Sequence, residues 1–315
     1  MLKLARLAMR TRFEIVLADG ADPAHLRAAG EEALDEIERI EAWLSAFKPE
    51  SELSSVNAHA ASRPIRVSAP FFKLLEDAAM HSEHTRGAFD MSVAPLLRYW
   101  QGISSGTGVV DETERTQAHA LVGMQNLCLD SVNSTVRFSK NGVCLDPGAI
   151  GKGYAIERAA NILREAGIQS ALLHGGTSTV CAIGAPPGNS AWVIAIQHPA
   201  RRDALLARAM LHDRSLSVSA VHGKTFWAAG RRFGHVIDPR SGWPVKDTLL
   251  AACVADSATE TDALSTALLV LGLGTGSDGA SALVENYPTA SVLVASQQGT
   301  TDEVSTMIVG QNFCV

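Results

Sequence analysis

Apolar positions recur along this chain with two periods, one typical of helices and one typical of strands. After a turn rich in Asp, Gly and Pro at residues 19–23, apolar side chains follow at helical spacing from Leu26 to Leu44, which predicts a long amphipathic helix. An alternating pattern before that turn predicts a first strand over residues 8–17. Further helices are predicted at 69–84, 112–122, 154–166 and 258–271, and further strands at 64–68, 127–130, 134–138, 170–174, 181–184, 192–196, 215–219, 225–227, 232–237, 249–255, 291–295 and 304–309.

Several neighbouring strand runs are joined by short turns rather than by helices, which is typical of β-hairpins. Helices and strands alternate only in places, so the order favours an α+β fold with mixed or antiparallel sheets flanked by helices over a doubly wound sheet. The 315 residues suffice for one large domain or two ordinary ones. Because the chain has no repeat and no clear linker, we predict a single domain over 1–315, with two sublobes and the active site between them. The Gly/Ser-rich stretch at 102–108 is predicted to be a loop and is a candidate lid.

Charge and composition exclude several classes of protein. A net charge of −6 argues against a nucleic-acid partner, which would need a basic surface. No apolar run reaches the roughly 18 residues needed to span a bilayer. Three cations among the first ten residues interrupt any signal-peptide core, and the five cysteines are scattered, as in proteins of a reducing compartment. We therefore expect a cytoplasmic protein, with an exported form of a longer chain as the alternative.

A glycine-rich stretch, Leu145-Asp-Pro-Gly-Ala-Ile-Gly-Lys-Gly-Tyr154, lies between a strand-like run and a helix-like run. Its glycines would let the backbone approach a ligand, and the N–H groups at the start of the helix favour an anion. Lys152 adds a positive charge and Asp146 an acceptor. The spacing is not that of a Walker A loop. These features predict a phosphate-binding cradle, and the alternative is that the glycines only make a tight turn.

Asp262 and Thr266 are four residues apart in the predicted helix 258–271, so they share one face. A carboxylate one turn from a hydroxyl offers two hard oxygen ligands, which suit Mg²⁺. The alternative is that Asp262 sits near the positive end of the helix dipole and Thr266 fills the core.

His235 stands at a strand end, just before Ile237-Asp-Pro239, where it is a candidate general base. The alternative is a histidine with a structural role. Taken together, the cradle, the pair of metal ligands and the candidate base indicate chemistry on a phosphate-containing ligand.

Seven motifs, in order and spread over nearly the whole chain, resemble those of the FAD:protein FMN transferases, the ApbE-type flavin transferases formerly called thiamine-biosynthesis lipoproteins. They are Met9-x-Thr11, Phe47-x-x-x-Ser51-Glu-Leu, Thr85-x-Gly-Ala-Phe-Asp90, Asp146-x-Gly-Ala-Ile-Gly-Lys-Gly-Tyr154, Gly175-Gly176, His235-Val-Ile-Asp-Pro-Arg-x-Gly242 and Thr261-Asp-Ala-Leu-Ser-Thr266.

This resemblance implies the flavin transferase fold, FAD as the donor, an essential Mg²⁺ and a target flavoprotein. FMN would pass to a threonine hydroxyl of that protein, and AMP would leave. The resemblance also implies roles for individual residues. Met9, Phe47, Ala88, Phe89 and Asp90 would line the flavin and adenine sites, Asp146 and Lys152 would hold FAD near its pyrophosphate, the Ala149 carbonyl, Asp262, Ser265 and Thr266 would bind Mg²⁺, and His235 would stand beside the reacting phosphate.

The sequence also departs from the pattern of this family at Arg10, where Gly is usual, at Phe47, where Tyr is common, at Pro147 within the cradle, and at Thr177, where Asp or Asn is common. Two alternatives to a transferase remain. One is a pyrophosphatase that cleaves FAD to FMN and AMP with water. The other is a non-catalytic FAD-binding protein, which would have no need of the set formed by Asp262, Thr266 and His235.

Overall fold

The computed structural model describes residues 1–20, 22–105, 109–201, 203–221, 225–228, 231–274, 279–297 and 304–315. The chain forms two compact units. Unit 1 comprises Met1–Glu41, Ile150–Ala220 and Thr248–Val315, and unit 2 comprises Ala42–Ala149 and Val221–Asp247. The chain therefore passes from unit 2 to unit 1 within the glycine-rich stretch, between Ala149 and Ile150.

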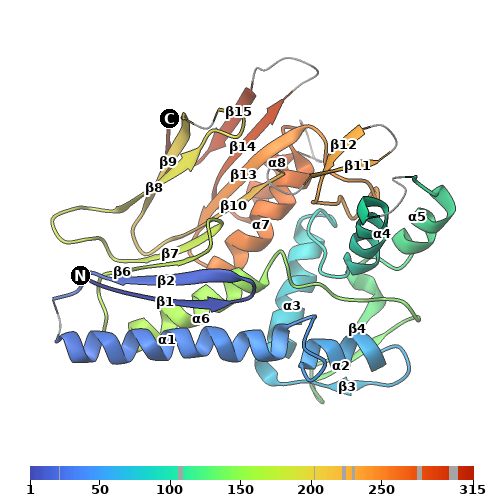
Figure 1. Ribbon diagram of the computed structural model, residues 1–315, viewed down its shortest axis with the longest axis horizontal. Coiled ribbons are helices and arrows are strands. Elements are labelled where there is room, and N and C mark those ends of the chain that lie inside the picture. The colour runs from blue at the N-terminus through green and yellow to red at the C-terminus, as the bar shows by residue number, and fades with distance from the viewer. Residues whose placement is uncertain are drawn as a thin grey trace. The chain divides into compact units, whose positions relative to one another are not determined.

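Unit 1 is built on an eight-stranded sheet in which all neighbouring strands are antiparallel (Figure 1). The strand order is β1-β2-β6-β7-β10-β13-β14-β15. The strands are β1 (Leu2–Ala8), β2 (Thr11–Leu17), β6 (Ala171–Gly175), β7 (Thr179–Ile183), β10 (Ser215–Ala220), β13 (Thr248–Ala255), β14 (Ser291–Gln297) and β15 (Val304–Val309).

A second, three-stranded sheet of unit 1 has the order β16-β9-β8. It consists of β8 (Trp192–Gln197), β9 (Leu205–Leu211) and β16 (Phe313–Cys314). Alternate side chains of the two sheets, among them Leu216, Ala252 and Leu293 of the large sheet and Ile196 and Phe313 of the small one, form one apolar cluster. The large sheet therefore buries one face against the small sheet.

Two helices pack on the large sheet, α6 (Gly151–Glu165) and α7 (Ala258–Leu271). On the other face of the large sheet, the side chains of β10 and β13 are mostly small or hydroxylated. Ser217, Ser219 and Cys253 are examples, and their small size lets α7 approach closely. Unit 1 also contains α8 (Ala280–Asn286) and most of α1 (Pro23–Leu44). Arg6 of β1 forms ion pairs with three acidic residues of α1, Glu31, Asp35 and Glu38.

Unit 2 combines short helices with two small antiparallel sheets. Its core includes an aromatic cluster around the buried Trp100, which packs against Phe226, Phe233 and Trp243. The elements are α2 (Glu52–His59), β3 (Ile65–Arg66), α3 (Ala69–His84), α4 (Ala94–Ser105), α5 (Glu112–His119), the 3₁₀ turn η1 (Met124–Asn126), β4 (Leu127–Asp130), β5 (Thr135–Phe138), β11 (Thr225–Ala228) and β12 (Arg231–Gly234).

The predicted α+β class with antiparallel sheets and flanking helices is confirmed, and so is the long helix after Pro23. The predicted strand over 8–17 was wrong in its boundary. A two-residue turn, Met9–Arg10, interrupts it, and the residues before the turn form β1, which pairs back onto β2. The predicted loop at 102–108 was also wrong in its first part, because 102–105 continue α4; residues 106–108 lie outside the described residues. In the described ranges, no helix combines the length and the apolar character that crossing a lipid bilayer requires.

Candidate functional site

Asp262 is the centre of a polar cluster in unit 1. It lies in the second turn of α7, which Ser257 caps by accepting a hydrogen bond from the Glu260 N–H. Only 3% of Asp262 is exposed. A carboxylate that loses its water needs hydrogen bonds and an opposite charge in exchange. The Gly153 N–H donates to Oδ2 at 3.0 Å, the Thr179 hydroxyl donates to Oδ1 at 3.3 Å, and Lys152 Nζ lies 3.5 Å from Oδ1.

Gly153 is required by the close approach of α6 to α7. A Cβ at this position would lie 2.2 Å from the Ala258 carbonyl oxygen and 2.7 Å from the Asp262 Cβ. The Gly153 N–H, one of the free donors at the start of α6, is used to orient the Asp262 carboxylate. Gly153 is therefore needed for the packing of α6 against α7, and the N-terminus of α6 faces the carboxylate of Asp262.

Three hydroxyl side chains and the backbone carbonyl of Asp262 form a cluster where α7 faces β10. Ser219 Oγ lies 2.9 Å from Ser265 Oγ and 3.3 Å from Thr266 Oγ1. Both α7 hydroxyls donate back to the Asp262 carbonyl, at 3.0 Å from Ser265 and 3.4 Å from Thr266. Asp262, Ser265 and Thr266 thus lie on successive turns of α7, and Lys152 lies beside the Asp262 carboxylate.

This donor set fits Mg²⁺ in its chemistry. All of its members are hard oxygens, which Mg²⁺ prefers, and Mg²⁺ is commonly held by one or two carboxylates plus the phosphates of a substrate. In the part of the chain that the structure describes, no three His, Cys, Asp or Glu side chains converge on a metal-binding position. A metal here would therefore be held by a single carboxylate, by hydroxyl and carbonyl oxygens and by its ligand.

The Met9–Arg10 turn lies near the same end of the large sheet. Both residues have positive φ, 49° and 60°, and the Met9 N–H donates to Glu41 at 2.9 Å. Gly176, with φ 61°, donates to the Arg12 carbonyl at 2.9 Å, and a Cβ on it would lie 2.6 Å from the Thr11 hydroxyl. The Gly175-Gly176 pair therefore fits the turn between β6 and β7 against the start of β2, three residues before Thr179.

The remaining predicted residues lie in unit 2. Asp146 accepts from the Gly148 N–H at 2.7 Å, and its own N–H donates to the Met91 carbonyl. Ala149 is the last residue before the chain enters unit 1. Phe47 is 76% exposed, whereas Ala88 and Phe89 are buried.

Asp90 is buried and its carboxylate is held within unit 2. Oδ1 accepts from the N–H and the hydroxyl of Ser92, and Oδ2 accepts from the Met124 N–H and the Ser82 hydroxyl. Burial raises the pKa of Asp90, although these hydrogen bonds oppose the shift. Asp90 thus ties the segment after α3 to η1, and its predicted role toward FAD stays a prediction.

His235 is exposed and lies directly after β12. Two residues later Ile237 pairs with Pro244 across a turn in which the Asp238 N–H donates to the Trp243 carbonyl at 2.8 Å. Arg240 forms an ion pair with Asp238 within the turn. His235 is therefore presented on the surface of unit 2 by a folded turn.

Four polar side chains with long-range contacts were not predicted from the sequence. Thr179 and Ser219 contact the Asp262 cluster, Ser217 contacts Thr261 at 3.1 Å, and Asn57 binds both backbone groups of Leu145. The serines at 215, 217 and 219 alternate in sequence, so their spacing placed them on one face of a strand. Their partners, which lie more than 40 residues away, could not be read from it.

Comparisons with known proteins agree with this architecture. Residues 9–293 match the model of the ApbE family. The chain is 30% identical over 268 residues to the FAD:protein FMN transferase of Haemophilus influenzae, covering 80% of this chain and 76% of that protein. It is 29% identical over 255 residues to the FAD:protein FMN transferase of Klebsiella pneumoniae, covering 80% and 78%.

Two solved structures share the fold. The ApbE protein of Thermotoga maritima superposes with a TM-score of 0.83 at 28% identity, over 96% of each chain. The flavinyl transferase ApbE of Pseudomonas stutzeri, in its apo form, superposes with a TM-score of 0.82 at 26% identity, over 98% of this chain and 94% of that one. With a family match that spans most of its length, the chain belongs to the ApbE family.

Proposed function

We propose that the protein is an Mg²⁺-dependent FAD:protein FMN transferase that moves FMN from FAD to a threonine hydroxyl of a target flavoprotein. The observation that carries the proposal is the buried Asp262, which has Lys152 at 3.5 Å and the hydroxyls of Ser265 and Thr266 one turn further along α7. The transferase names of its relatives support the reaction.

Asp262, Ser265 and Thr266 are the residues that would hold the metal ion, with the Ala149 carbonyl as the additional ligand that the resemblance implies. When bound, Mg²⁺ supplies positive charge to the oxygens of a pyrophosphate. The Gly153 N–H and the Thr179 hydroxyl hold the Asp262 carboxylate in place, which would orient it toward the metal ion. Lys152 brings a cation to the same carboxylate and would stabilise the negative charge of the phosphates.

The reaction breaks one phosphoanhydride bond and forms one phosphoester bond. The threonine oxygen attacks the phosphorus of the FMN half, the bond from that phosphorus to the bridging oxygen breaks, and AMP leaves with this oxygen. The threonine proton passes to His235, whose exposure lets the side chain of another protein reach it. The residues of the chain act by positioning and by charge, as in other phosphoryl-type transfers.

AMP release from FAD tests the proposal, measured with and without Mg²⁺ and with and without a flavoprotein that carries the acceptor threonine. We expect AMP only when both are present, together with an acceptor that becomes covalently fluorescent. AMP and free FMN in the absence of acceptor would instead identify a pyrophosphatase. FAD binding with no AMP under any condition would identify a binding protein and overturn the proposal.

A further inference from the structure

Helix α5 (Glu112–His119) is unusual because none of its residues is buried. Helices in proteins gain most of their stability from an apolar face that packs on a core, whereas α5 offers the aromatic cluster of unit 2 little more than the small, half-buried Ala118. Instead, α5 sends polar side chains onto the turn formed by Asp238–Pro244, which follows His235. Both segments belong to unit 2.

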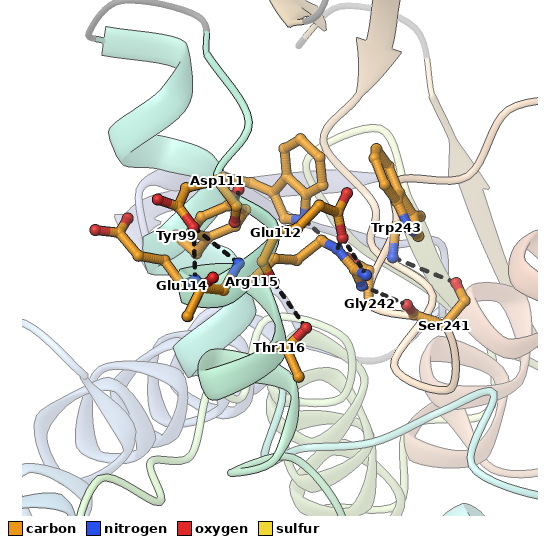
Figure 2. A network of polar contacts seen from close by, with 11 residues as sticks. Tyr99, Asp111, Glu112, Glu114, Arg115, Thr116, Ser241, Gly242 and Trp243 are labelled. Atoms are coloured by element: carbon orange, nitrogen blue, oxygen red, sulfur yellow. Dashed lines mark hydrogen bonds and ion pairs between the residues drawn. The ribbon is translucent and has the colours of Figure 1, made fainter.

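Arg115 makes the most extensive of these contacts. Its guanidinium carbon lies 4.9 Å from the centroid of the Trp243 ring, and Nη1 donates to the Ser241 carbonyl at 3.0 Å. Glu112, one turn earlier in α5, accepts from Nε at 3.1 Å and from Nη2 at 2.7 Å. Figure 2 shows Arg115 held between Glu112 on its own helix and the turn at Ser241–Trp243. Only 14% of the Arg115 side chain is exposed, whereas that of Glu112 is 62% exposed, so water screens the ion pair more than the contacts with Trp243 and Ser241.

Two further side chains hold neighbouring carbonyl groups of the same turn. The buried Trp100 of α4 donates from Nε1 to the Gly242 carbonyl at 3.0 Å, and the His119 ring lies with Nε2 3.0 Å from the Pro239 carbonyl oxygen. Gly242 has φ 72°, and a Cβ on it would lie 3.0 Å from Arg115 Nη1 and 3.4 Å from the His119 ring. Glycine thus gives the turn its left-handed residue and lets α5 approach.

Backbone hydrogen bonds within the turn connect these contacts to the residue next to His235. Within it, the Gly242 N–H donates to the Asp238 carbonyl at 2.8 Å, and the Val245 N–H donates to the Val236 carbonyl at 2.9 Å. Val236 is the residue next to His235, whose own side chain is exposed rather than packed in the core. The backbone next to His235 is therefore placed by the turn.

We propose that Arg115, through Trp243 and the Ser241 carbonyl, is a positioning residue for His235. This inference rests on the proposed function, in which His235 accepts the threonine proton. Proton transfer needs donor and acceptor at hydrogen-bond distance, and a misplacement of about 1 Å can lower a rate about 100-fold. Arg115 acts by keeping the turn in place and does not itself contact the reacting groups.

The kinetic test uses Arg115→Ala and Arg115→Lys, with Lys73→Ala as the matched control. Lys73 forms an ion pair within a helix of the same unit, 2.7 Å from Asp77, and serves α3 rather than the turn. We expect Arg115→Ala to lower kcat for FMN transfer about 10- to 100-fold, with KM for FAD changed less than about twofold. Arg115→Lys should be intermediate, because lysine keeps a cation over Trp243 but loses the planar fork that also binds Glu112. The control should keep its kcat.

A double-mutant cycle with His235→Ala separates positioning from a general loss of structure. If Arg115 acts through His235, then Arg115→Ala should lower the residual kcat of His235→Ala less than about twofold. A further loss as large as in the wild-type background would show that Arg115 acts independently of His235, and would overturn the proposal.

Amide hydrogen exchange tests the contact without any reference to activity. Arg115→Ala should speed exchange of the Gly242 and Val245 amides at least about tenfold. The Val67 amide, which donates to Ser134 elsewhere in unit 2, should keep its rate. Unchanged exchange at Gly242 and Val245 would overturn the proposal whatever the enzyme does. Absence of FMN transfer by the wild-type protein, with exchange as expected, would instead refute the catalytic role of His235 and with it the proposed function.

Discussion

The surroundings of Asp262 in unit 1 and of His235 in unit 2 hold a polar side chain in opposite ways. Asp262 is buried, and a backbone N–H of one helix fixes it to the next. His235 is exposed, and its turn is held by side chains of α4 and α5. A carboxylate proposed to bind a metal gains from a rigid, dry setting, whereas a base that must meet the side chain of another protein has to remain at the surface. The first arrangement should therefore be most sensitive to changes of the carboxylate itself or of the backbone that holds it, and the second to changes of the side chains that hold its turn.

The largest effect should come from the buried carboxylate itself. Asp262→Ala should lower Mg²⁺-dependent AMP release about 1,000-fold, because the charge stabilisation that a metal ion supplies is worth several kcal/mol. Asp256→Ala is the matched control, since Asp256 lies just before the same helix but its side chain is 75% exposed and pairs with Arg214. Far-UV circular dichroism should show unchanged helix content in both variants. Undiminished AMP release by Asp262→Ala would refute its role as a metal ligand.

Gly153→Ala should destabilise the surroundings of Asp262, because the added Cβ clashes with the backbone of α7. The new Cβ would meet the Ala258 carbonyl oxygen at 2.2 Å, and neither helix can move without disturbing the core. We expect the free energy of unfolding, measured in urea, to fall by about 3 kcal/mol. Gly102→Ala is the control, because the site of its Cβ is open and alanine favours helix α4 by about 0.5–1 kcal/mol. Equal stability of Gly153→Ala and the wild type would mean that α6 and α7 do not require this close approach.

Trp100→Phe should destabilise the protein less than Gly153→Ala does, through the turn formed by Asp238–Pro244. The change removes the donor to the Gly242 carbonyl and part of a buried ring, and we expect a loss of about 2 kcal/mol in unfolding free energy. It should also speed exchange of the Gly242 amide. Trp43→Phe serves as control, since Trp43 packs on Phe71 at 5.3 Å and should lose less than about 1 kcal/mol. If Gly242 exchanged no faster in Trp100→Phe, the turn would owe its position to its internal hydrogen bonds.

The same two regions show how far sequence reasoning reaches. The spacing of Asp262 and Thr266 correctly placed them together, because i and i+4 share a face in any α-helix. The contacts of Thr179 and Ser219 were missed because the packing of α7 on the sheet brings together side chains 46 to 83 residues apart. The strand over 8–17 was misjudged because Met9 and Arg10 adopt left-handed conformations that usually call for glycine. Arg115 was overlooked because α5 is almost entirely polar and has no buried residue that would reveal a partner.

The smallest effect concerns Glu260, one half-turn before Asp262 on α7. Burial, followed by the charges of Asp256 and Glu157, raises the pKa of Glu260 to about 6 from 4.5. A carboxyl group whose pKa is higher in the folded state leaves stability intact below pH 4.5 and lowers it as pH rises toward about 6. Glu260→Gln should therefore be as stable as the wild type at about pH 4 and more stable by about 1 kcal/mol at pH 7.5, after allowance for solvent screening.

Glu114→Gln supplies the matched control, because Glu114 also lies in the first turn of its helix but is exposed. There the carboxylate is favoured by the helix dipole without a burial penalty, so glutamine should be slightly destabilising, by less than about 1 kcal/mol. Opposite signs of the two changes at pH 7.5, measured by urea unfolding, would show that burial outweighs the dipole at the start of α7. A destabilised Glu260→Gln would mean that the ionised carboxylate is favoured there, and that the rigid surroundings of Asp262 tolerate a second, half-buried charge.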